Sequence, residues 1–277
     1  MLRPSAYALV LVLLLACFLV PIWTDAPAQA QGGSSMPPPA AREARAAEFR
    51  FFARSAYEIA AEPCDFSPDL KRKSVLASEL GALADFERSG PSADLQSQLQ
   101  VARDDAAYAV TVKPRDCSPE ALALLSPAQT RIELDRGALR EMLARMRVLA
   151  PTLASEPSLH SPPTSPQDAE FRYLARRVTM IVSPVCPFSR KKDRISTLAG
   201  SRELVTRLRN RVRPTRFEAQ FATAEADEWF YRSTRVTECQ TPDGPMTPEL
   251  VRRAAAEVKT AVTRMEAIAG TELGRRP

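Results

Sequence analysis

The stretch Ala47-Glu48-Phe49-Arg50-Phe51-Phe52-Ala53-Arg54 returns 122 residues later as Ala169-Glu170-Phe171-Arg172-Tyr173-Leu174-Ala175-Arg176, with six of the eight residues identical. Laid over each other without a gap, residues 47–117 and 169–239 agree at 18 of 71 positions. Cys64 and Cys117 lie 53 residues apart, and so do Cys186 and Cys239. We therefore predict an internal duplication, with a first repeat at 47–150 and a second repeat at 169–270.

Each repeat contains four segments with helical period. In the first segment Phe49, Phe52, Ala53 and Ile59 fall on one face of a helix, and the equivalent residues of the second repeat do the same. No stretch alternates apolar and polar residues over a useful length. The pattern predicts an all-α protein built from two tandem homologous up-down-up-down four-helix bundles.

The four cysteines fit this topology. In such a bundle the loops after the first and third helices lie at the same end, and each repeat has one cysteine in each of these loops. We expect the bridges Cys64–Cys117 and Cys186–Cys239, one at an end of each bundle. Bridges between the repeats would require two bundle ends to face each other.

The N-terminus predicts export. Arg3 precedes an apolar run from Tyr7 to Val20, and Ala28-Gln29-Ala30 has the spacing of a signal-peptidase site. We expect a signal peptide at 1–30 and an extracytoplasmic protein, periplasmic or secreted, which suits the even cysteine set. A membrane tether stays open, through an uncleaved N-terminus or a lipid on Cys17.

Proline-rich segments separate the folded parts. We expect a disordered leader at 31–46, a proline-rich linker at 151–168 that holds the single histidine, His160, and a tail at 271–277. Nine glycines and one histidine exclude a glycine-rich phosphate loop, a histidine-ligated metal site and a Ser-His-Asp centre. No catalytic residue, metal ligand or cofactor is expected.

Charge differs between the repeats. Residues 47–150 hold 14 Lys and Arg against 16 Asp and Glu, whereas residues 169–277 hold 21 against 13. An anionic envelope component or an acidic protein could dock on the second repeat, and a merely solvated basic face is the other interpretation. Nucleic acid is not expected, because aromatic residues do not interleave with the basic run. The candidate anion-binding residues are Arg190, Lys191, Lys192, Arg194, Arg207 and Arg211.

One polar set recurs in both repeats. Arg50, Arg54 and Asp105 should stand at one height in the first bundle, and Arg172, Arg176 and Asp227 in the second. We expect an Arg-Asp-Arg ion-pair cluster within each bundle, which fixes helix register. A sharper hypothesis is a carboxylate pocket that Asp105 fills when no ligand is bound.

Three functions remain open. The first is a non-enzymatic binding protein with a basic second lobe. The second is a hydrolase that uses carboxylates and arginines on a saccharide or phosphoester, and the third is a structural spacer.

The second repeat also contains three successive aromatic residues, Trp229, Phe230 and Tyr231. They cannot all face one core, so we expect at least one at the surface or between the lobes.

Overall fold

The computed structural model describes residues 39–89, 92–113, 115–155, 165–182, 198–213, 215–234 and 247–273. These residues form α-helices and contain no β-strand, apart from an isolated bridge between Ser67 and Leu70. The prediction of an all-α fold is confirmed. Among the described helices, none is long and apolar enough to cross a membrane.

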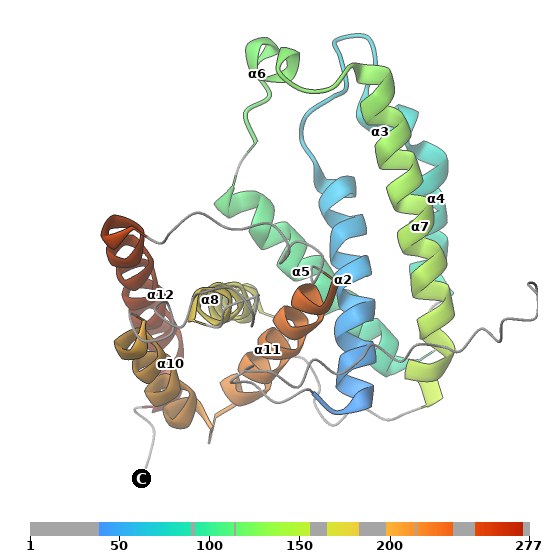
Figure 1. The fold of residues 1–277 in the computed structure, drawn as a ribbon. Helices are drawn as coiled ribbons and strands as arrows, with labels where there is room; N and C mark the ends of the chain where they lie inside the picture. The colour runs from blue at the N-terminus through green and yellow to red at the C-terminus, as the bar shows by residue number, and fades with distance from the viewer. Residues whose placement is uncertain are drawn as a thin grey trace, which may run out of the picture. The chain divides into compact units, whose positions relative to one another are not determined.

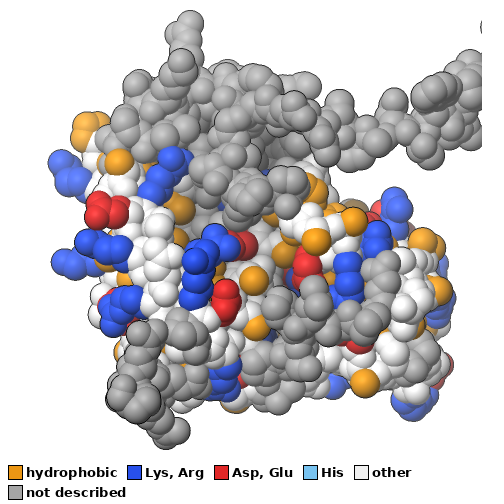
Figure 2. Space-filling model, turned by 90° about the horizontal axis from the view of Figure 1, so that it is seen from below, with side chains coloured by type: hydrophobic (Ala, Val, Ile, Leu, Met, Phe, Trp, Pro, Cys, Tyr) orange, Lys and Arg blue, Asp and Glu red, His pale blue; other side chains and the backbone are white. Residues whose placement is uncertain are grey.

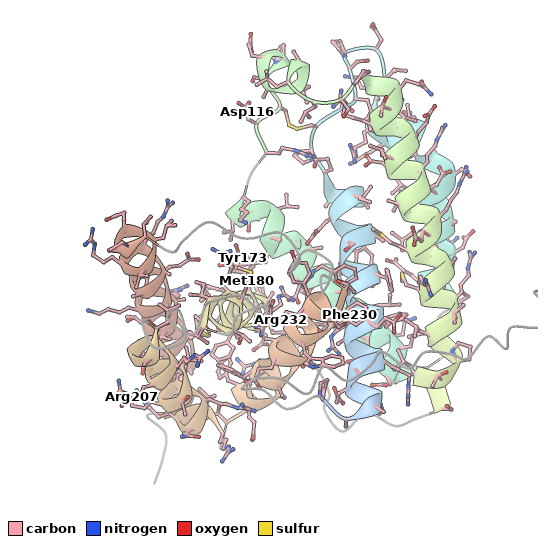
Figure 3. The ribbon with its side chains drawn as sticks, in the orientation of Figure 1. Asp116, Tyr173, Met180, Arg207, Phe230 and Arg232 are labelled. Atoms are coloured by element: carbon pink, nitrogen blue, oxygen red, sulfur yellow. A yellow bond between two sulfur atoms is a disulfide. The ribbon has the colours of Figure 1, made fainter. Side chains whose placement is uncertain are left out.

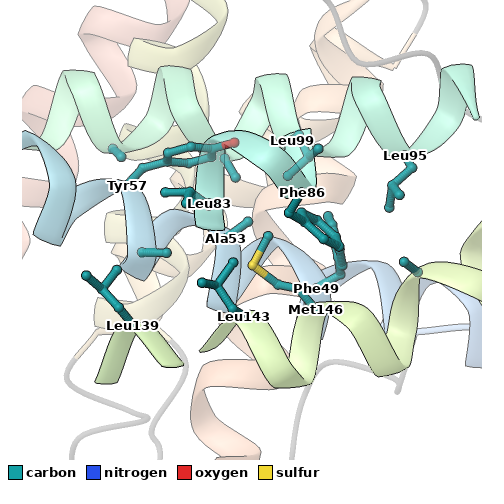
Figure 4. Packing of buried hydrophobic residues seen from close by; sticks show 14 of the residues in the cluster. Phe49, Ala53, Tyr57, Leu83, Phe86, Leu95, Leu99, Leu139, Leu143 and Met146 are labelled. Carbon is teal, nitrogen blue, oxygen red and sulfur yellow. The ribbon is translucent and has the colours of Figure 1, made fainter. Parts of the chain in front are cut away.

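The first repeat centres on α2 (Ala41–Ala61), which packs against α5 (Ala93–Val112) and α7 (Ala128–Ser155). The short α3 (Arg72–Val75) leads into α4 (Ala77–Arg88), which packs on α7, and α6 (Pro119–Ala123) precedes α7. Figure 4 shows how Phe49, Phe86 and Met146 from three of these helices meet in one core. Burial of such apolar side chains is the main stabilising contribution to the repeat.

The second repeat centres on α8 (Pro166–Val182), which packs against α11 (Phe217–Thr234) and α12 (Pro248–Leu273), while α10 (Ala199–Val212) packs on α12. Phe171, Phe217 and Phe221 form an aromatic centre here, with ring centroids of Phe171 and Phe217 4.7 Å apart. The two cores contain different residues, so each repeat buries its own apolar surface.

The repeats meet through two helix pairs. α2 of the first repeat packs against α11 of the second, and α5 packs against α8 (Figure 1). We call this contact of α2, α5, α8 and α11 the repeat interface.

Local signals explain where several helices begin. Ser92 Oγ accepts from the N–H of Leu95 at the start of α5, and Thr247 Oγ1 accepts from the N–H of Leu250 at the start of α12. Ser165 and Asp168 hydrogen-bond each other's side chains and backbone N–H groups in both directions, as in a capping box. Pro248 follows Thr247 as the first residue of α12, a position at which proline removes no helical hydrogen bond.

Two helices extend into the segments that the sequence predicts to be leader and linker. α2 begins at Ala41, inside the predicted leader 31–46, because Ala46 is buried and Arg42 pairs with Asp94 of α5 at 2.5 Å. α7 continues through Pro151 to Ser155, inside the predicted linker 151–168, since Leu153 is fully buried against the core. Core burial offsets the hydrogen bond that proline removes from the helix.

The bridge Cys64–Cys117 is present, with the two Cα atoms 5.2 Å apart, and this predicted pairing is confirmed. It joins the segment after α2 to the segment after α5. Cys186 and Cys239 lie outside the described residues, as do Cys17, His160, Arg190, Lys191, Lys192 and Arg194.

Candidate functional site

The recurring arginines and aspartates come together at the repeat interface, and they pair between repeats. Arg50 Nε donates to Asp227 Oδ1 at 2.8 Å, and Arg172 Nε donates to Asp105 Oδ1 at 2.9 Å. Our prediction placed Arg50 with Asp105, and Arg172 with Asp227, inside each bundle. It left open whether the repeats pack together. Helix docking brings each aspartate to an arginine of the other repeat, and among the described residues Arg176 with Asp227, at 3.4 Å, is the one predicted pair found within a repeat.

A glutamine holds each arginine from within its own repeat. Arg50 Nη1 donates to Gln98 Oε1 at 2.5 Å, and Arg172 Nη1 donates to Gln220 Oε1 at 2.6 Å. Gln98 and Gln220 are identical in the repeat alignment, yet neither entered the predicted cluster. Their recurrence beside buried arginines is the sequence signal that would have found them.

Aromatic contacts repeat the same exchange. The rings of Phe51 and Phe230 lie 5.4 Å apart, and those of Tyr173 and Tyr108, which hold the equivalent positions, lie 5.3 Å apart. Contacts that come in such exchanged pairs are those of a two-fold symmetric interface. The repeat interface therefore has the contact pattern of a homodimer within one chain.

The predicted aromatic cluster lies partly at this interface. Phe230 also contacts Phe52, and Tyr231 contacts Phe51, whereas Trp229 is half-buried on α11. Figure 3 shows Phe230 on α11 beside α2, and Tyr173 and Met180 on α8.

The ion pairs perturb the titration of the buried groups. Burial alone would raise the pKa of Asp105, but Arg176, Arg172 and Arg54 outweigh it and hold the pKa below its ordinary value. Arg176 Nη1 reaches Asp105 at 2.6 Å and Asp227 at 3.4 Å. Burial would lower its pKa, and these two aspartates raise it instead.

Arg54 differs from the other three arginines. Its side chain is 18% exposed, and its one ion pair among the described residues is with Glu58 at 3.6 Å. Burial and the neighbouring Arg176 lower its pKa, and nearby carboxylates offset this only in part. Arg54 thus has guanidinium N–H groups that no described residue accepts.

A cavity of about 470 Å³ opens at Arg54, between the two repeats. All four helices of the repeat interface line it. The charged lining residues are Arg54, Lys113, Arg176, Arg177, Glu58, Glu62, Asp227 and Glu228, and the others are Ala109, Val110, Tyr173, Met180 and Tyr231. This volume is in the range of pockets that take small organic molecules.

Most charges in the wall already have partners. Glu62 pairs with Arg115, Arg177 pairs with Glu257, and Glu228 pairs with Arg232 at 3.1 Å. Burial raises the pKa of Glu228 despite that arginine. Among the described residues, Lys113 has no ion pair, and Arg54 has the long contact with Glu58.

Of the candidate anion-binding residues, the described Arg207 and Arg211 lie on α10, and neither lines this cavity. Arg211 pairs with Glu266, Arg209 with Glu225 at 2.9 Å, and Arg207 with Glu203 at 3.6 Å. Figure 2 shows basic and acidic side chains interspersed over the face that it displays. The described arginines of α10 are thus mostly compensated by carboxylates.

One described group has the spacing of metal ligands, namely Glu62, Cys64 and Cys117. The two sulfurs form the disulfide, so they offer no thiolate to a metal.

Searches of protein-family models, curated proteins and solved structures find no match to this chain.

Proposed function

We propose that the protein is an exported, non-enzymatic binding protein that takes a small anion in the cavity between its repeats. The observation that carries this proposal is Arg54, whose side chain is 18% exposed and whose one ion pair among the described residues is long. A buried cation without full compensation is unfavourable, and a bound anion would remove that cost.

Charged side chains from both repeats surround Arg54. Arg50, Arg54, Arg172 and Arg176 meet at the centre of the interface, where Asp105 and Asp227 are their buried carboxylate partners. Glu58 adds a third carboxylate at the rim, 44% exposed. Of the charged residues that line the cavity, four are basic and four are acidic, so the case for an anion rests on the weakly paired Arg54 and not on an excess of positive charge.

Thermal unfolding of the purified mature chain in benzoate, octanoate, succinate and inorganic phosphate tests this proposal. A ligand that binds the folded state alone raises Tm. We expect at least one of these anions to raise Tm in the wild type and not in Arg54→Met. Arg207→Met, on the exposed face of α10, is the matched control and should respond as the wild type does. Failure of all four anions would overturn the proposal.

Export and the complete fold belong to the same proposal. A signal peptide at 1–30, two tandem four-helix bundles and a second bridge Cys186–Cys239 are supported by the apolar N-terminus and the duplicated cysteine spacing. N-terminal sequencing with non-reducing peptide mapping of the exported protein should give a start at Gln31 and bridges 64–117 and 186–239. Free thiols on an intact N-terminus would contradict both.

Docking of an anionic envelope component or an acidic protein on the second repeat is a further proposed partnership. Arg207 supports it, since its side chain is 63% exposed and its pair with Glu203 is long. Binding to vesicles that contain anionic lipid should fall in Arg207→Glu and rise at low salt. Equal binding by the wild type and this variant would exclude α10 as the docking face.

A hydrolase is the second candidate function. Glu228 supports it, because a cavity carboxyl with a raised pKa can act as a general acid. Turnover of nitrophenyl glycosides or phosphoesters that Glu228→Gln abolishes would favour the hydrolase over a binding protein. The absence of turnover together with anion binding would favour the binding protein.

A further inference from the structure

We propose that the cavity holds an amphiphilic acid, with its single carboxylate at Arg54 and its apolar body against Met180 and Tyr231. This inference rests on the proposed function, because it names the ligand class of the same cavity. Three observations support it: the N–H groups of Arg54 that donate to no described residue, the apolar residues in the cavity wall, and the residue differences between equivalent positions of the two repeats.

The guanidinium of Arg54 fits one carboxylate, and Lys113 is a further cation of the wall. Arg176 already contacts both Asp105 and Asp227, so its guanidinium is engaged. Arg54 donates no hydrogen bond to a described residue, and its contact with Glu58 is 3.6 Å long. A guanidinium presents a planar fork of N–H groups that matches the two oxygens of a carboxylate.

The cavity lies on the approximate two-fold axis of the repeat interface. Three pairs of lining residues hold equivalent positions 122 apart, namely Arg54 with Arg176, Glu58 with Met180, and Ala109 with Tyr231. Because the cavity is lined by both members of each pair, it lies on the axis that relates the two repeats.

Only the arginines are the same in both repeats. Glu58 faces the cavity from the first repeat, whereas the equivalent Met180 presents a thioether, and the small Ala109 is replaced by the large Tyr231. At these two positions the first repeat presents an acidic and a small side chain and the second presents an apolar and an aromatic one, beside the charged Arg176, Arg177, Asp227 and Glu228. A ligand with two unlike ends fits this wall better than a symmetric ion does.

The apolar part of the lining, which comes from both repeats, suits a hydrocarbon or aromatic body. Met180, Val110 and Tyr173 add carbon surface to Tyr231, and Met is unbranched and adapts to irregular shapes. Burial of the ligand's carbon atoms would contribute binding free energy that inorganic phosphate lacks.

Isothermal titration calorimetry on the full mature chain separates these contributions. The probes are octanoate, octan-1-ol, octylammonium and inorganic phosphate, which vary the charge and the apolar body one at a time. We expect octanoate to bind at least about tenfold more tightly than any other probe, where tenfold corresponds to about 1.4 kcal/mol.

Two variants locate the ligand's ends. Arg54→Met removes the cation and should weaken octanoate at least about tenfold, a loss of about 1.4 kcal/mol. Met180→Glu installs the residue of the first repeat in the apolar part of the lining and should weaken octanoate similarly. Arg207→Met, on the surface of α10, should bind octanoate as the wild type does.

The outcomes are distinct. If phosphate binds as tightly as octanoate and Arg54→Met abolishes both, the anion site stands and the amphiphile is wrong. If octanoate binds equally to the wild type and Arg54→Met, the placement of the carboxylate is wrong. If no anion binds, both the amphiphile and the proposed function fall.

Discussion

Two groups of arginines in this chain meet carboxylates in opposite settings. At the repeat interface Arg172 is 0% exposed and Asp105 is 1% exposed, and the two side chains bridge the two repeats. On α10 Arg207 is 63% exposed and Glu203 is 69% exposed, and both belong to one helix. The composition counts all of these charges alike, but only the first group is removed from water.

The exposed and the buried ion pairs are expected to contribute differently to the free energy of unfolding. A surface pair is screened by water and salt, and it contributes about 0 to 1 kcal/mol. A buried pair adds little to stability in itself, yet removal of one partner leaves a charge that the interior cannot solvate. The interface pairs therefore specify which surfaces of the repeats meet, while the α10 pairs compensate a basic face.

The largest effect is expected from Asp105→Ala. It leaves the fully buried Arg172 without its carboxylate, so we expect a loss of about 4 kcal/mol in the free energy of unfolding. Urea denaturation followed by circular dichroism measures this loss. Arg207→Ala is the control, and its free energy of unfolding should stay within about 0.5 kcal/mol of the wild-type value. Equal losses in Asp105→Ala and Arg207→Ala would show that the interface and α10 charges contribute alike.

Acid should remove part of the same contribution. The pKa of Asp105 is lowered in the folded protein, so the folded state binds the proton less tightly than the unfolded chain. Stability from ionised Asp105 is present above the unfolded pKa of about 3.9 and is lost as pH falls through the lower folded value. In Asp105→Asn the free energy of unfolding should fall less steeply below about pH 4. Glu203→Gln, on the surface of α10, is the control and should follow the wild type. If the free energy of unfolding falls as steeply in Asp105→Asn as in the wild type, groups other than Asp105 cause the acid sensitivity.

Replacement of both members of an interface pair should cost less than truncation of one. We expect Asp105→Leu combined with Arg172→Met to lie within about 2 kcal/mol of the wild type, because Arg172 is removed together with its carboxylate and Arg176 keeps its contact with Asp227. Chemical denaturation of the double variant against Asp105→Ala measures the recovery. A double variant as unstable as Asp105→Ala would show that the pair itself stabilises the fold.

The smallest effect is expected on α10. Arg211→Ala breaks the exposed pair with Glu266 and should change stability by about 0.5 kcal/mol or less. Any difference should shrink further in high salt, since exposed charges are screened. A loss of several kcal/mol that salt does not alter would place Arg211 with the buried group.

The sequence predicted the elements well and their mutual arrangement poorly. Helical period and the duplicated cysteine spacing are local or internal signals, so the all-α class and the bridge Cys64–Cys117 could be read from one chain. The pairing of Arg50 with Asp227 depends on how the repeats dock. Because each repeat contains the same arginine and the same aspartate, the sequence is compatible with pairing within a repeat and with pairing between repeats.

The cavity could not be predicted for the same reason. Glu58, Met180 and Lys113 carry no motif and become neighbours of Arg54 only when four helices from two repeats meet. The helix ends near Pro151 and Ala41 were also missed, because burial of Leu153 and Ala46 prevails over local composition.

The central claim is that the interface arginines pair between the repeats. A double-mutant cycle of Arg50→Met with Asp227→Ala, read by urea denaturation, tests it against the same cycle of Arg50→Met with Asp105→Ala. We predict a coupling of about 2 kcal/mol for Arg50 with Asp227 and a clearly smaller value for Arg50 with Asp105. A larger coupling of Arg50 with Asp105 would show that Arg50 pairs within its own repeat and would contradict pairing between the repeats.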